Sequence, residues 1–320
     1  MRPCIVVTRE VFDETIAYLS QHLDVDANQA DAAYTPEALA QKLAACDGVM
    51  CALTDRIDAA LLERCPKLKA VANIAVGYNN IDVPACTARG IKVTNTPGVL
   101  DDSTADLAFA LMLATARRIT EVESTIRNGQ WTGWRLKQWL GVDVHHATLG
   151  IVGMGRIGQA IAKRAAGFDM KVLYHNRKRA APEIERRLNA TYVSMDALLA
   201  RSDFIILQMP YTPDTHHLIG EVQLKKMKPT AILINSTRGG VVDDKALIEA
   251  LNSGTIRAAG LDVFENEPKL DPGFLKLKNV VLAPHIGSST EATRRAMAMT
   301  AAKNLVAALT GQPPPNWVNP

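Results

Sequence analysis

The stretch Thr148–Phe168, TLGIVGMGRIGQAIAKRAAGF, carries the clearest structural signal in the chain. An apolar run leads into Gly153, Gly155 and Gly158, spaced as G-x-G-x-x-G, and a helical pattern follows. The first glycine permits a tight turn, the second lets the backbone approach a pyrophosphate, and the third lets helix and strand pack closely. The pyrophosphate would then lie on free amides at a helix N-terminus. The stretch therefore predicts a strand–turn–helix unit that binds a dinucleotide.

The same stretch opens a longer alternation of strands and helices. Helical patterns separate six strand candidates: TLGIVG, KVLYHN, DFIILQMP, AILINST, AAGLDVF and VVLAPH. Strands that alternate with helices form parallel sheets covered on both faces. We therefore expect a doubly wound α/β sheet and assign residues 100–290 to a dinucleotide-binding domain.

Residues 1–99 show a similar alternation and predict a second α/β domain. The strand candidates are CIVV, GVMCAL, LKAVANI and IKVTNT, and one intervening helix is expected to begin at Pro36 with Thr35 as its cap. Residues 101–119 are apolar on nearly every helical face, which predicts a helix buried all round, either between two domains or at a subunit interface. The amphipathic segment within 291–320 is expected to cross back to the first domain.

Composition narrows the class of protein. The formal net charge is only +3, so we expect neither a nucleic acid nor a membrane as partner. The five cysteines are scattered without a C-x-x-C spacing, which indicates free thiols in a reducing compartment. No signal peptide is expected at the N-terminus, and the longest apolar run is too short to span a bilayer. These features favour a cytoplasmic protein. The adjacent pairs His145–His146 and His216–His217 would diverge on one strand, so we expect no metal site.

The end of the second strand candidate bears on the choice of dinucleotide. Sites for NAD usually carry Asp or Glu about 20 residues beyond the glycines, to bind the ribose 2′-hydroxyl. Here the position is Asn176, followed by Arg177, Lys178 and Arg179. A neutral residue beside three cations suits a 2′-phosphate better, because a guanidinium binds phosphate in a fixed fork. We therefore expect NADPH to be preferred, with NADH as the weaker alternative; a solvated basic loop is the other interpretation.

Polar residues follow three successive strand candidates near the end of the chain. Arg238 follows AILINST, Glu265 and Glu267 follow AAGLDVF, and His285 follows VVLAP directly. The carboxyl ends of strands in a doubly wound sheet are where ligands bind. An arginine there suits a carboxylate, which it can bind with two parallel hydrogen bonds. Three such placements together indicate an active site rather than three accidents of packing.

At this point the chain resembles a known family, the D-isomer-specific 2-hydroxyacid dehydrogenases. The segments GIVGMGRIGQ, INSTRGGVVD, GLDVFENEP and PHIGSST carry the resemblance, together with NIAVGYNNID and VTNTPGV in the first half. Within that family the chain is most similar to glyoxylate/hydroxypyruvate reductases, including the type that also reduces 2-ketogluconate. The resemblance implies a Rossmann-type cofactor domain, a flavodoxin-like substrate domain with a cleft between them, and a homodimer formed through the cofactor domain.

The resemblance also implies a role for each candidate residue. Arg238 would hold the substrate carboxylate, His285 would protonate the carbonyl oxygen as hydride arrives, and Glu267 would pair with that histidine. Val76 and Gly77 would bind the substrate carboxylate through their amides, and Trp139 would reach the partner subunit's active site, with plain interface packing as the alternative. The positions expected to contact the cofactor, besides the three glycines, Asn176 and Arg177, are Arg156, Ile157, Met209, Ser236 and Asp262.

Several alternatives stay open at this level. A phosphoglycerate-type dehydrogenase would normally keep an acidic residue at position 176, and a formate dehydrogenase would be expected to carry Gln in place of Glu267. A binding protein that senses the dinucleotide without turnover belongs to a different functional class, and it would be expected to carry partner-binding tails. The sequence does not distinguish among glyoxylate, hydroxypyruvate and 2-ketogluconate as the substrate.

Overall fold

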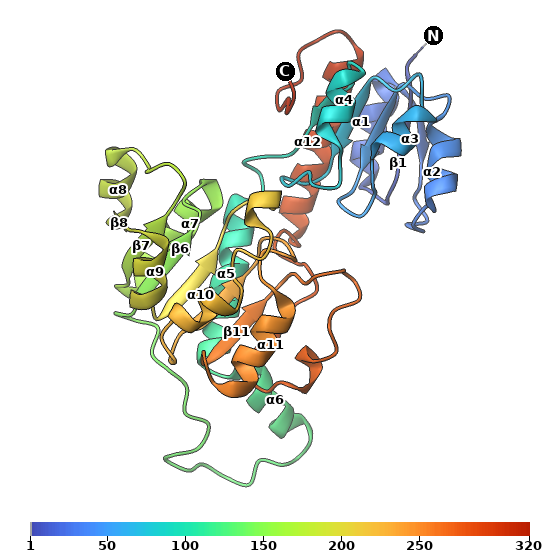
Figure 1. Ribbon diagram of the computed structural model, residues 1–320. Helices are drawn as coiled ribbons and strands as arrows, with labels where there is room; N and C mark the ends of the chain where they lie inside the picture. Colours follow the sequence, from blue (N-terminus) through green and yellow to red (C-terminus); the bar gives the residue numbers. More distant parts are fainter. Residues whose placement is uncertain (1) are drawn as a thin grey trace. The chain divides into compact units, whose positions relative to one another are not determined.

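Parallel strands with helices between them build both halves of the chain (Figure 1). The structure is a computed structural model that describes residues 2–320. It divides into two units: unit 1 contains the residues up to Leu100 together with Ser289–Pro320, and unit 2 contains Asp101–Ser288. The expected α/β class with two parallel-sheet domains is confirmed.

Unit 1 is a five-stranded parallel sheet in the order β2-β1-β3-β4-β5, which is the flavodoxin order. Its strands are β1 (Cys4–Val7), β2 (Asp24–Ala27), β3 (Gly48–Cys51), β4 (Ala70–Asn73) and β5 (Lys92–Thr94). Its helices are α1 (Asp13–His22), α2 (Pro36–Leu43), α3 (Ala59–Glu63), α4 (Val83–Ala88) and α12 (Glu291–Leu309). The cap on α2 forms as expected, because the Thr35 hydroxyl accepts a hydrogen bond from the Ala38 amide.

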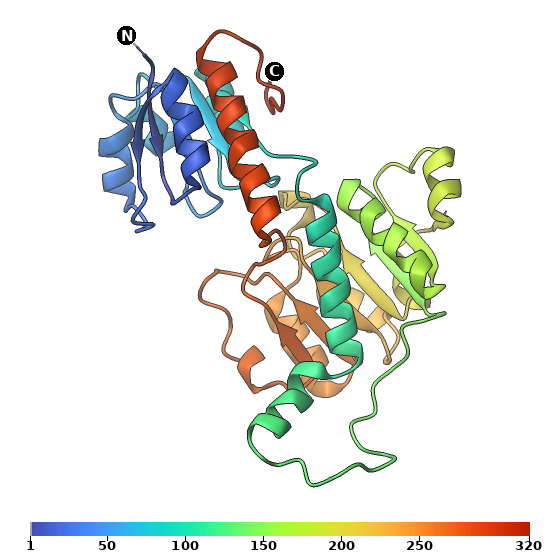
Figure 2. The same cartoon turned by 180° about the vertical axis from the view of Figure 1, so that it is seen from behind.

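The long helix α12 comes from the end of the chain and packs on β3, β4 and β5, beside α1 (Figure 2). Its buried residues include Ala298, Ala301 and Leu305, whose small or branched side chains let the helix approach the sheet closely. Beyond it, the Val318 amide donates to the Val93 carbonyl, so the Pro-rich tail is tied to the edge strand β5.

Unit 2 is a seven-stranded parallel sheet in the order β12-β11-β10-β9-β6-β7-β8. Its strands are β6 (Thr148–Val152), β7 (Lys171–His175), β8 (Ala190–Tyr192), β9 (Phe204–Leu207), β10 (Ile232–Asn235), β11 (Ala258–Leu261) and β12 (Val280–Leu282). Its α-helices are α5 (Asp101–Ala116), α6 (Ile119–Arg127), α7 (Arg156–Ala165), α8 (Pro182–Leu188), α9 (Met195–Arg201), α10 (Glu221–Lys226) and α11 (Asp244–Ser253). The direction of winding reverses between β6 and β9, and a doubly wound sheet binds its ligand at such a switch point.

Two strands escaped the sequence prediction, and both lie at sheet edges. The expected count of six strands in the second half is wrong, because β8 adds a seventh. In unit 1, β2 is the missed edge strand, and it carries the charged residues Asp24 and Asp26 on a partly exposed ribbon. Edge strands are short and solvated, so they lack the continuous apolar run that marks a buried strand.

Helix α5 is less enclosed than its composition predicts. One side packs against β10, β11 and β12, and α7 lies beside it. However, Asp102, Asp106 and Ala110 are exposed. Arg164 of α7 donates hydrogen bonds to both aspartates, which anchors the two helices on their solvent side. Within the single chain, burial therefore does not extend to this strip of the helix, and burial at a subunit interface stays a prediction.

Two global expectations can be compared with the structure. All five cysteines are free thiols, as their scattered positions predict. Within residues 2–320, no helix combines the length and the apolar character that a membrane span requires.

Candidate active site

His285 and Glu267 form a hydrogen-bonded pair in unit 2. His285 follows β12 and Glu267 follows β11, and these neighbouring parallel strands end at the same edge of the sheet. The imidazole Nδ1 lies 2.8 Å from the Glu267 Oε2 atom. The side chains keep 24% and 30% of their surface exposed, respectively, so the ring can still be reached from outside. A carboxylate at this distance fixes the orientation of the ring.

The Glu267 carboxylate is held on its other side as well. Its Oε1 atom accepts a hydrogen bond of 2.9 Å from the Phe264 amide. Burial raises the pKa of Glu267, but the hydrogen bond and charge of His285, the Phe264 amide and the charge of Arg238 together outweigh it, so that the pKa is lowered from its ordinary value. The carboxylate therefore stays ionised beside the imidazole.

Arg238 follows β10, the next strand in the sheet, and completes the expected group of three. Its Nη1 donates to the Thr237 carbonyl at 2.8 Å. Burial lowers the pKa of the guanidinium, whereas the charge of Glu267 opposes that shift. A desolvated cation beside a paired carboxylate and histidine can bind an anion more strongly than an exposed arginine can. The structure thus brings Arg238, Glu267 and His285 to one edge of the sheet.

Two residues, Asn235 and His217, contact the loops of this group, although the sequence analysis did not name them as site residues. Buried Asn235 accepts hydrogen bonds from the amide and hydroxyl of Thr237, and its side-chain amide donates to the Arg238 carbonyl. His217 contacts the Glu265 carboxylate at 2.5 Å, which forms a second histidine–carboxylate pair beside the first. Asn235 could have been found from the sequence, because it is a polar residue at the end of an otherwise apolar strand.

Asp262 fixes the loop that carries His285. Only 1% of its surface is exposed, and its two carboxylate oxygens accept hydrogen bonds from the Ile286 amide at 2.7 Å and the Gly287 amide at 2.8 Å. Burial raises the pKa of Asp262, against the effect of these two amides and of His285. His285 itself has a φ of +55°, a backbone conformation that side chains larger than glycine seldom adopt. Two buried hydrogen bonds to the following residues stabilise that strained backbone.

The three glycines of the first motif lie where β6 meets α7. A Cβ on Gly153 would approach the Gln208 carbonyl oxygen to 2.0 Å, and one on Gly158 would approach the Gly153 carbonyl oxygen to 2.1 Å. Gly153 also has a φ of +107°. A Cβ on Gly155, by contrast, would meet nothing within 4 Å. Gly153 and Gly158 therefore allow close packing. Gly155 leaves open space at the helix N-terminus, which is the kind of place where a pyrophosphate binds.

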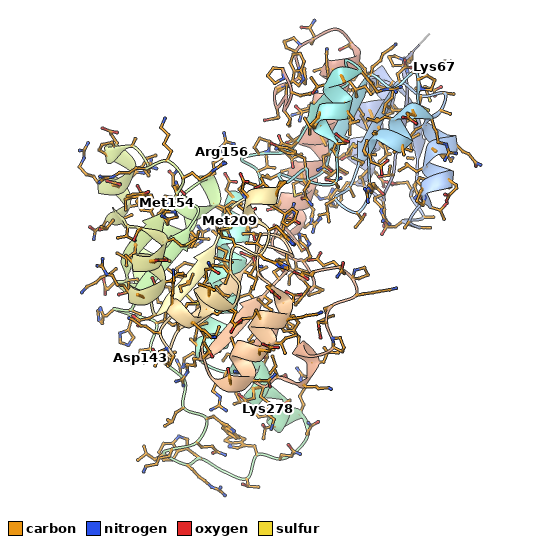
Figure 3. The ribbon with its side chains drawn as sticks, viewed as in Figure 1. Lys67, Asp143, Met154, Arg156, Met209 and Lys278 are labelled. Carbon is orange, nitrogen blue, oxygen red and sulfur yellow. The ribbon has the colours of Figure 1, made fainter. Side chains whose placement is uncertain are left out.

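The other expected cofactor positions surround this loop. Figure 3 labels Arg156 at the start of α7 and Met209 after β9, both at the end of the sheet where the strands terminate. Ile157 follows Arg156 in the first turn of α7. Ser236 follows β10 and accepts a hydrogen bond of 2.7 Å from the Gln208 side chain.

Asn176 and the basic run after β7 have distinct environments. The Asn176 Oδ1 atom accepts a 2.7 Å hydrogen bond from the Met154 amide, so this side chain holds the glycine loop. Arg179 makes two hydrogen bonds of 2.8 Å to Glu185 and lowers the pKa of that carboxyl to about 2. Arg177 and Lys178 are exposed, and neither has an ion pair within residues 2–320. We expected Arg179 to help in binding a phosphate. Its ion pair with Glu185 competes with that role.

Three expected residues belong to other segments of the chain than the group around His285. Trp139 lies in the segment between α6 and β6, and this segment loops away from the sheet of unit 2 (Figure 2). The first residues of α6 line a hollow together with the residues that begin β11 and β12. Helix α6 therefore begins at the end of the sheet opposite to His285. Val76 and Gly77 lie in unit 1, in the turn after β4.

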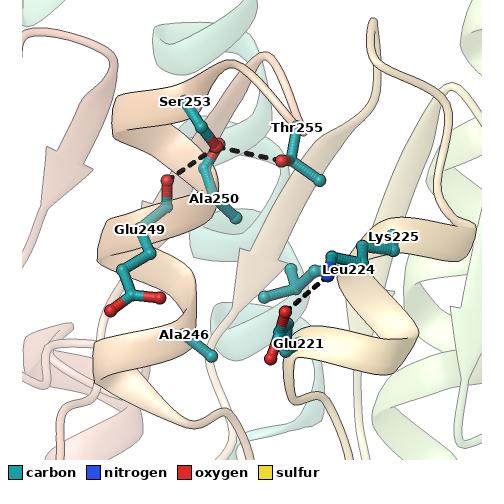
Figure 4. Close-up of a pocket in the computed structure, with 8 residues that line it drawn as sticks. All are labelled: Glu221, Leu224, Lys225, Ala246, Glu249, Ala250, Ser253 and Thr255. Carbon is teal, nitrogen blue, oxygen red and sulfur yellow. Dashed lines mark hydrogen bonds and ion pairs between the residues drawn. The ribbon is translucent and has the colours of Figure 1, made fainter.

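A hollow of about 190 Å³ between α10 and α11 has no part in this site (Figure 4). Its charged residues Glu221 and Lys225 pair with each other, and the Ser253 hydroxyl donates to the Glu249 carbonyl. These polar groups are already satisfied, so the hollow offers a ligand little beyond solvent contact. No group of three or more candidate metal ligands occurs in the part of the chain that the structure describes.

Comparison with known proteins gives a consistent result. Residues 109–287 match the model of the D-isomer specific 2-hydroxyacid dehydrogenase, NAD binding domain. A glyoxylate reductase from Thermococcus litoralis is 51% identical over 323 residues, covering 100% of this chain and 97% of the relative. One from Korarchaeum cryptofilum is 49% identical, covering 100% of this chain and 96% of the relative.

Solved structures extend the similarity to the whole fold. An NADPH-dependent glyoxylate/hydroxypyruvate reductase from Sinorhizobium meliloti, solved with NADP and malonate, has a TM-score of 0.88 and 33% identity, over 99% of this chain and 97% of that one. A glyoxylate reductase from Paecilomyes thermophila has a TM-score of 0.90 and 33% identity, over 99% and 98% of the two chains.

The glycine loop yields a paired prediction. Gly155→Ala should leave the free energy of unfolding within about 0.5 kcal/mol of the parent, because its Cβ enters open space. It should weaken dinucleotide binding at least about tenfold, because that space is where the pyrophosphate approaches the backbone. Gly158→Ala should instead cost about 1–3 kcal/mol of stability, since the Cβ overlaps backbone. Urea denaturation and fluorescence titration with NADPH measure both effects, and wild-type affinity in Gly155→Ala would contradict the assignment.

Proposed function

The chain belongs to the D-isomer-specific 2-hydroxyacid dehydrogenase family, and we propose that it reduces small 2-oxo acids to D-2-hydroxy acids with NADPH in preference to NADH. Glyoxylate and hydroxypyruvate are the substrates that we favour, with 2-ketogluconate as a further candidate. The relatives named glyoxylate reductase match essentially the full chain, which supports a 2-oxo acid reductase.

One observation carries this function more than any other. The His285–Glu267 pair lies 2.8 Å apart at the same sheet edge as Arg238, and the dinucleotide loop after β6 ends at that edge too. A proton donor, an anion-binding cation and a cofactor cradle on one edge are what the reduction of a charged carbonyl compound requires. The open space beside Gly155, at the N-terminus of α7, supports the binding of a pyrophosphate there.

Each residue has a distinct task in the proposed reaction. Arg238 binds the substrate carboxylate with two parallel hydrogen bonds and thereby orients the carbonyl group. His285, protonated and held by Glu267, donates a proton to the carbonyl oxygen, which becomes the hydroxyl of the product. Glu267 keeps its negative charge and stabilises the imidazolium. The reduced nicotinamide, when bound, supplies the hydride that the carbonyl carbon receives. The product thus gains one hydride and one proton.

The alternative functions explain the site less well. A carboxylate at position 267 disfavours a formate dehydrogenase, which would be expected to carry a glutamine there. A sensor without turnover would not need a protonatable pair beside a buried arginine. For a phosphoglycerate-type dehydrogenase, Asn176 is the unfavourable feature, since its side chain caps the Met154 amide and supplies no acid for a ribose hydroxyl.

The proposed preference for NADPH rests on Arg177 and Lys178. Both are exposed, next to Asn176, and free of ion pairs within residues 2–320, so they can meet a 2′-phosphate without first breaking another contact. Asn176 adds no negative charge that would repel the phosphate. The reductase from Sinorhizobium meliloti was solved with NADP, which supports the same choice.

We also propose a homodimer in which the segment after α6 contacts a second copy. Apolar side chains are exposed along it, with Trp134 at 78%, Leu136 at 75% and Leu140 at 59%, and Ile126 near the end of α6 is 62% exposed. Exposed apolar patches of this kind mark protein–protein contact sites. Trp139 lies among these residues and would reach the partner subunit's active site.

The cofactor proposal predicts a preference for NADPH over NADH of about 10- to 100-fold in kcat/KM, measured with glyoxylate. Arg177→Ala should reduce that ratio by a similar factor through the NADPH value alone, because it removes a charge-assisted hydrogen bond. Arg201→Ala is the matched control, since it removes an exposed cation just before β9 begins, at the opposite end of the sheet. A parent that prefers NADH, or an unchanged ratio in Arg177→Ala, would contradict the proposal.

A second prediction concerns the His285–Glu267 pair. Glu267→Gln keeps a hydrogen-bonding group beside His285 but removes the negative charge that lies 2.8 Å from the ring. The rate of reduction should therefore fall about tenfold or more at neutral pH, while the dissociation constant of NADPH changes less than about twofold. Stopped-flow rates with NADPH saturating measure this effect. A Glu267→Gln variant that reduces glyoxylate at the parent's rate would rule out the pairing as part of the proton-donating group.

The dimer proposal predicts that light scattering gives twice the 34.7 kDa mass of the chain. Trp139→Ala should remain dimeric and change the ranking of glyoxylate, hydroxypyruvate and 2-ketogluconate by kcat/KM. Trp317→Ala serves as the control, because it removes a tryptophan from unit 1 that is 37% exposed. Dissociation of Trp139→Ala into monomers would instead support plain interface packing.

A further inference from the structure

The turn after β4 in unit 1 has an unusual arrangement of backbone carbonyls. Three successive carbonyl oxygens, those of Ala75, Val76 and Gly77, all accept hydrogen bonds from within unit 1. Ala75 receives the Thr96 amide at 3.0 Å, Val76 receives the Asn95 side chain at 2.8 Å, and Gly77 receives the Asn73 side chain at 2.9 Å. Two asparagine side chains therefore supply two of the three donors.

This arrangement determines where the next three amides point. A trans peptide is planar, and its N–H points away from its C=O. The N–H groups of Val76, Gly77 and Tyr78 belong to the same peptides as the three held carbonyls, so each N–H points away from the group that holds its carbonyl. None of the three donates to an acceptor within residues 2–320. Successive unsatisfied amides on one side of a turn form a concavity that binds anions.

The asparagines that hold the turn belong to a larger network. Asn73 is fully buried, and its side chain lies 3.3 Å from that of Asn80. Asn80 in turn donates to the carbonyls of Ala52 and Asp55, at 3.2 and 3.0 Å, in the turn after β3. A buried polar network whose members are all hydrogen-bonded holds one geometry rather than several. The two neighbouring turns are thus tied together through side-chain amides.

We propose that Asn73 and Asn95 are positioning residues that aim the amides of Val76, Gly77 and Tyr78 at the carboxylate of the substrate. This inference rests on the proposed function, because it takes a 2-oxo acid as the anion. It also adds the Tyr78 amide as a third donor. An asparagine suits the task because it donates to a carbonyl while bringing no negative charge near an incoming carboxylate. An aspartate of the same shape could not donate and would repel both groups.

Asn95 offers the cleaner test, because its side chain makes one hydrogen bond in the described part of the chain, to Val76. Asn95→Ala should raise the KM for glyoxylate and the inhibition constant of oxamate, a carboxylate analogue, by about tenfold or more. The dissociation constant of NADPH should change less than about twofold. Asn95→Asp should behave likewise or worse. Gln29→Ala, which removes side-chain hydrogen bonds to Val11 beside β2, at the opposite edge of the sheet from β5, should match the parent.

The outcomes separate this inference from the function on which it rests. If the parent reduces glyoxylate and Asn95→Ala keeps its KM within twofold, the inference is wrong and the function stands. If the parent reduces no 2-oxo acid, the function fails, and calorimetric binding of oxamate then decides: binding by the parent but not by Asn95→Ala supports the positioning role, and any other pattern overturns it. A fall in Tm of more than about 10 °C in both Asn95 variants, with NADPH binding also lost, would make Asn95 a residue of the fold and contradict the proposal.

Discussion

Parallel pairing of β6 with β9, and of β9 through β12, is the constraint on which the site depends. Strands that run in one direction bring all their carboxyl ends to one edge, so residues far apart in the sequence meet there. Arg238, Glu267 and His285 follow three successive strands of this sheet, and the glycine loop follows β6. A single antiparallel strand among these would send its polar residue to the other edge and break the group.

Several features of this edge are unfavourable for the stability of the folded chain. His285 adopts a left-handed backbone conformation, Arg238 is desolvated, and Asp262 is a buried carboxylate, each of which is unfavourable alone. Local hydrogen bonds offset these costs: Asp262 binds two amides of the His285 loop, and Asn235 binds the turn of Arg238. Unit 1 uses the same device, where Asn73 and Asn95 hold the turn after β4. In each case buried or half-buried polar side chains fix a backbone that a ligand is expected to meet.

Much of this could be predicted from the sequence, because the central strands are continuous apolar runs and the polar residues stand directly after them. The β6–α7 turn could also be predicted, because the three glycines stand at fixed spacing directly after an apolar run. The missed features lack such a pattern. The edge strands β2 and β8 are short and solvated, Arg179 finds Glu185 only once α8 has folded, and the carbonyls that Asn73 and Asn95 bind depend on tertiary contacts. The exposed strip of α5 was missed because Asp102 and Asp106 are few among many apolar residues.

The central claim is that His285 protonates a 2-oxo acid during reduction to the D-hydroxy acid, and product analysis with hydroxypyruvate tests it most directly. We expect the parent to form D-glycerate in a one-to-one ratio with the NADPH consumed. His285→Gln should lower kcat by about 10²–10⁴-fold, the usual contribution of a general acid, while its affinity for NADPH stays within twofold. Formation of L-glycerate, or a His285→Gln variant with nearly the parent's kcat, would contradict the account.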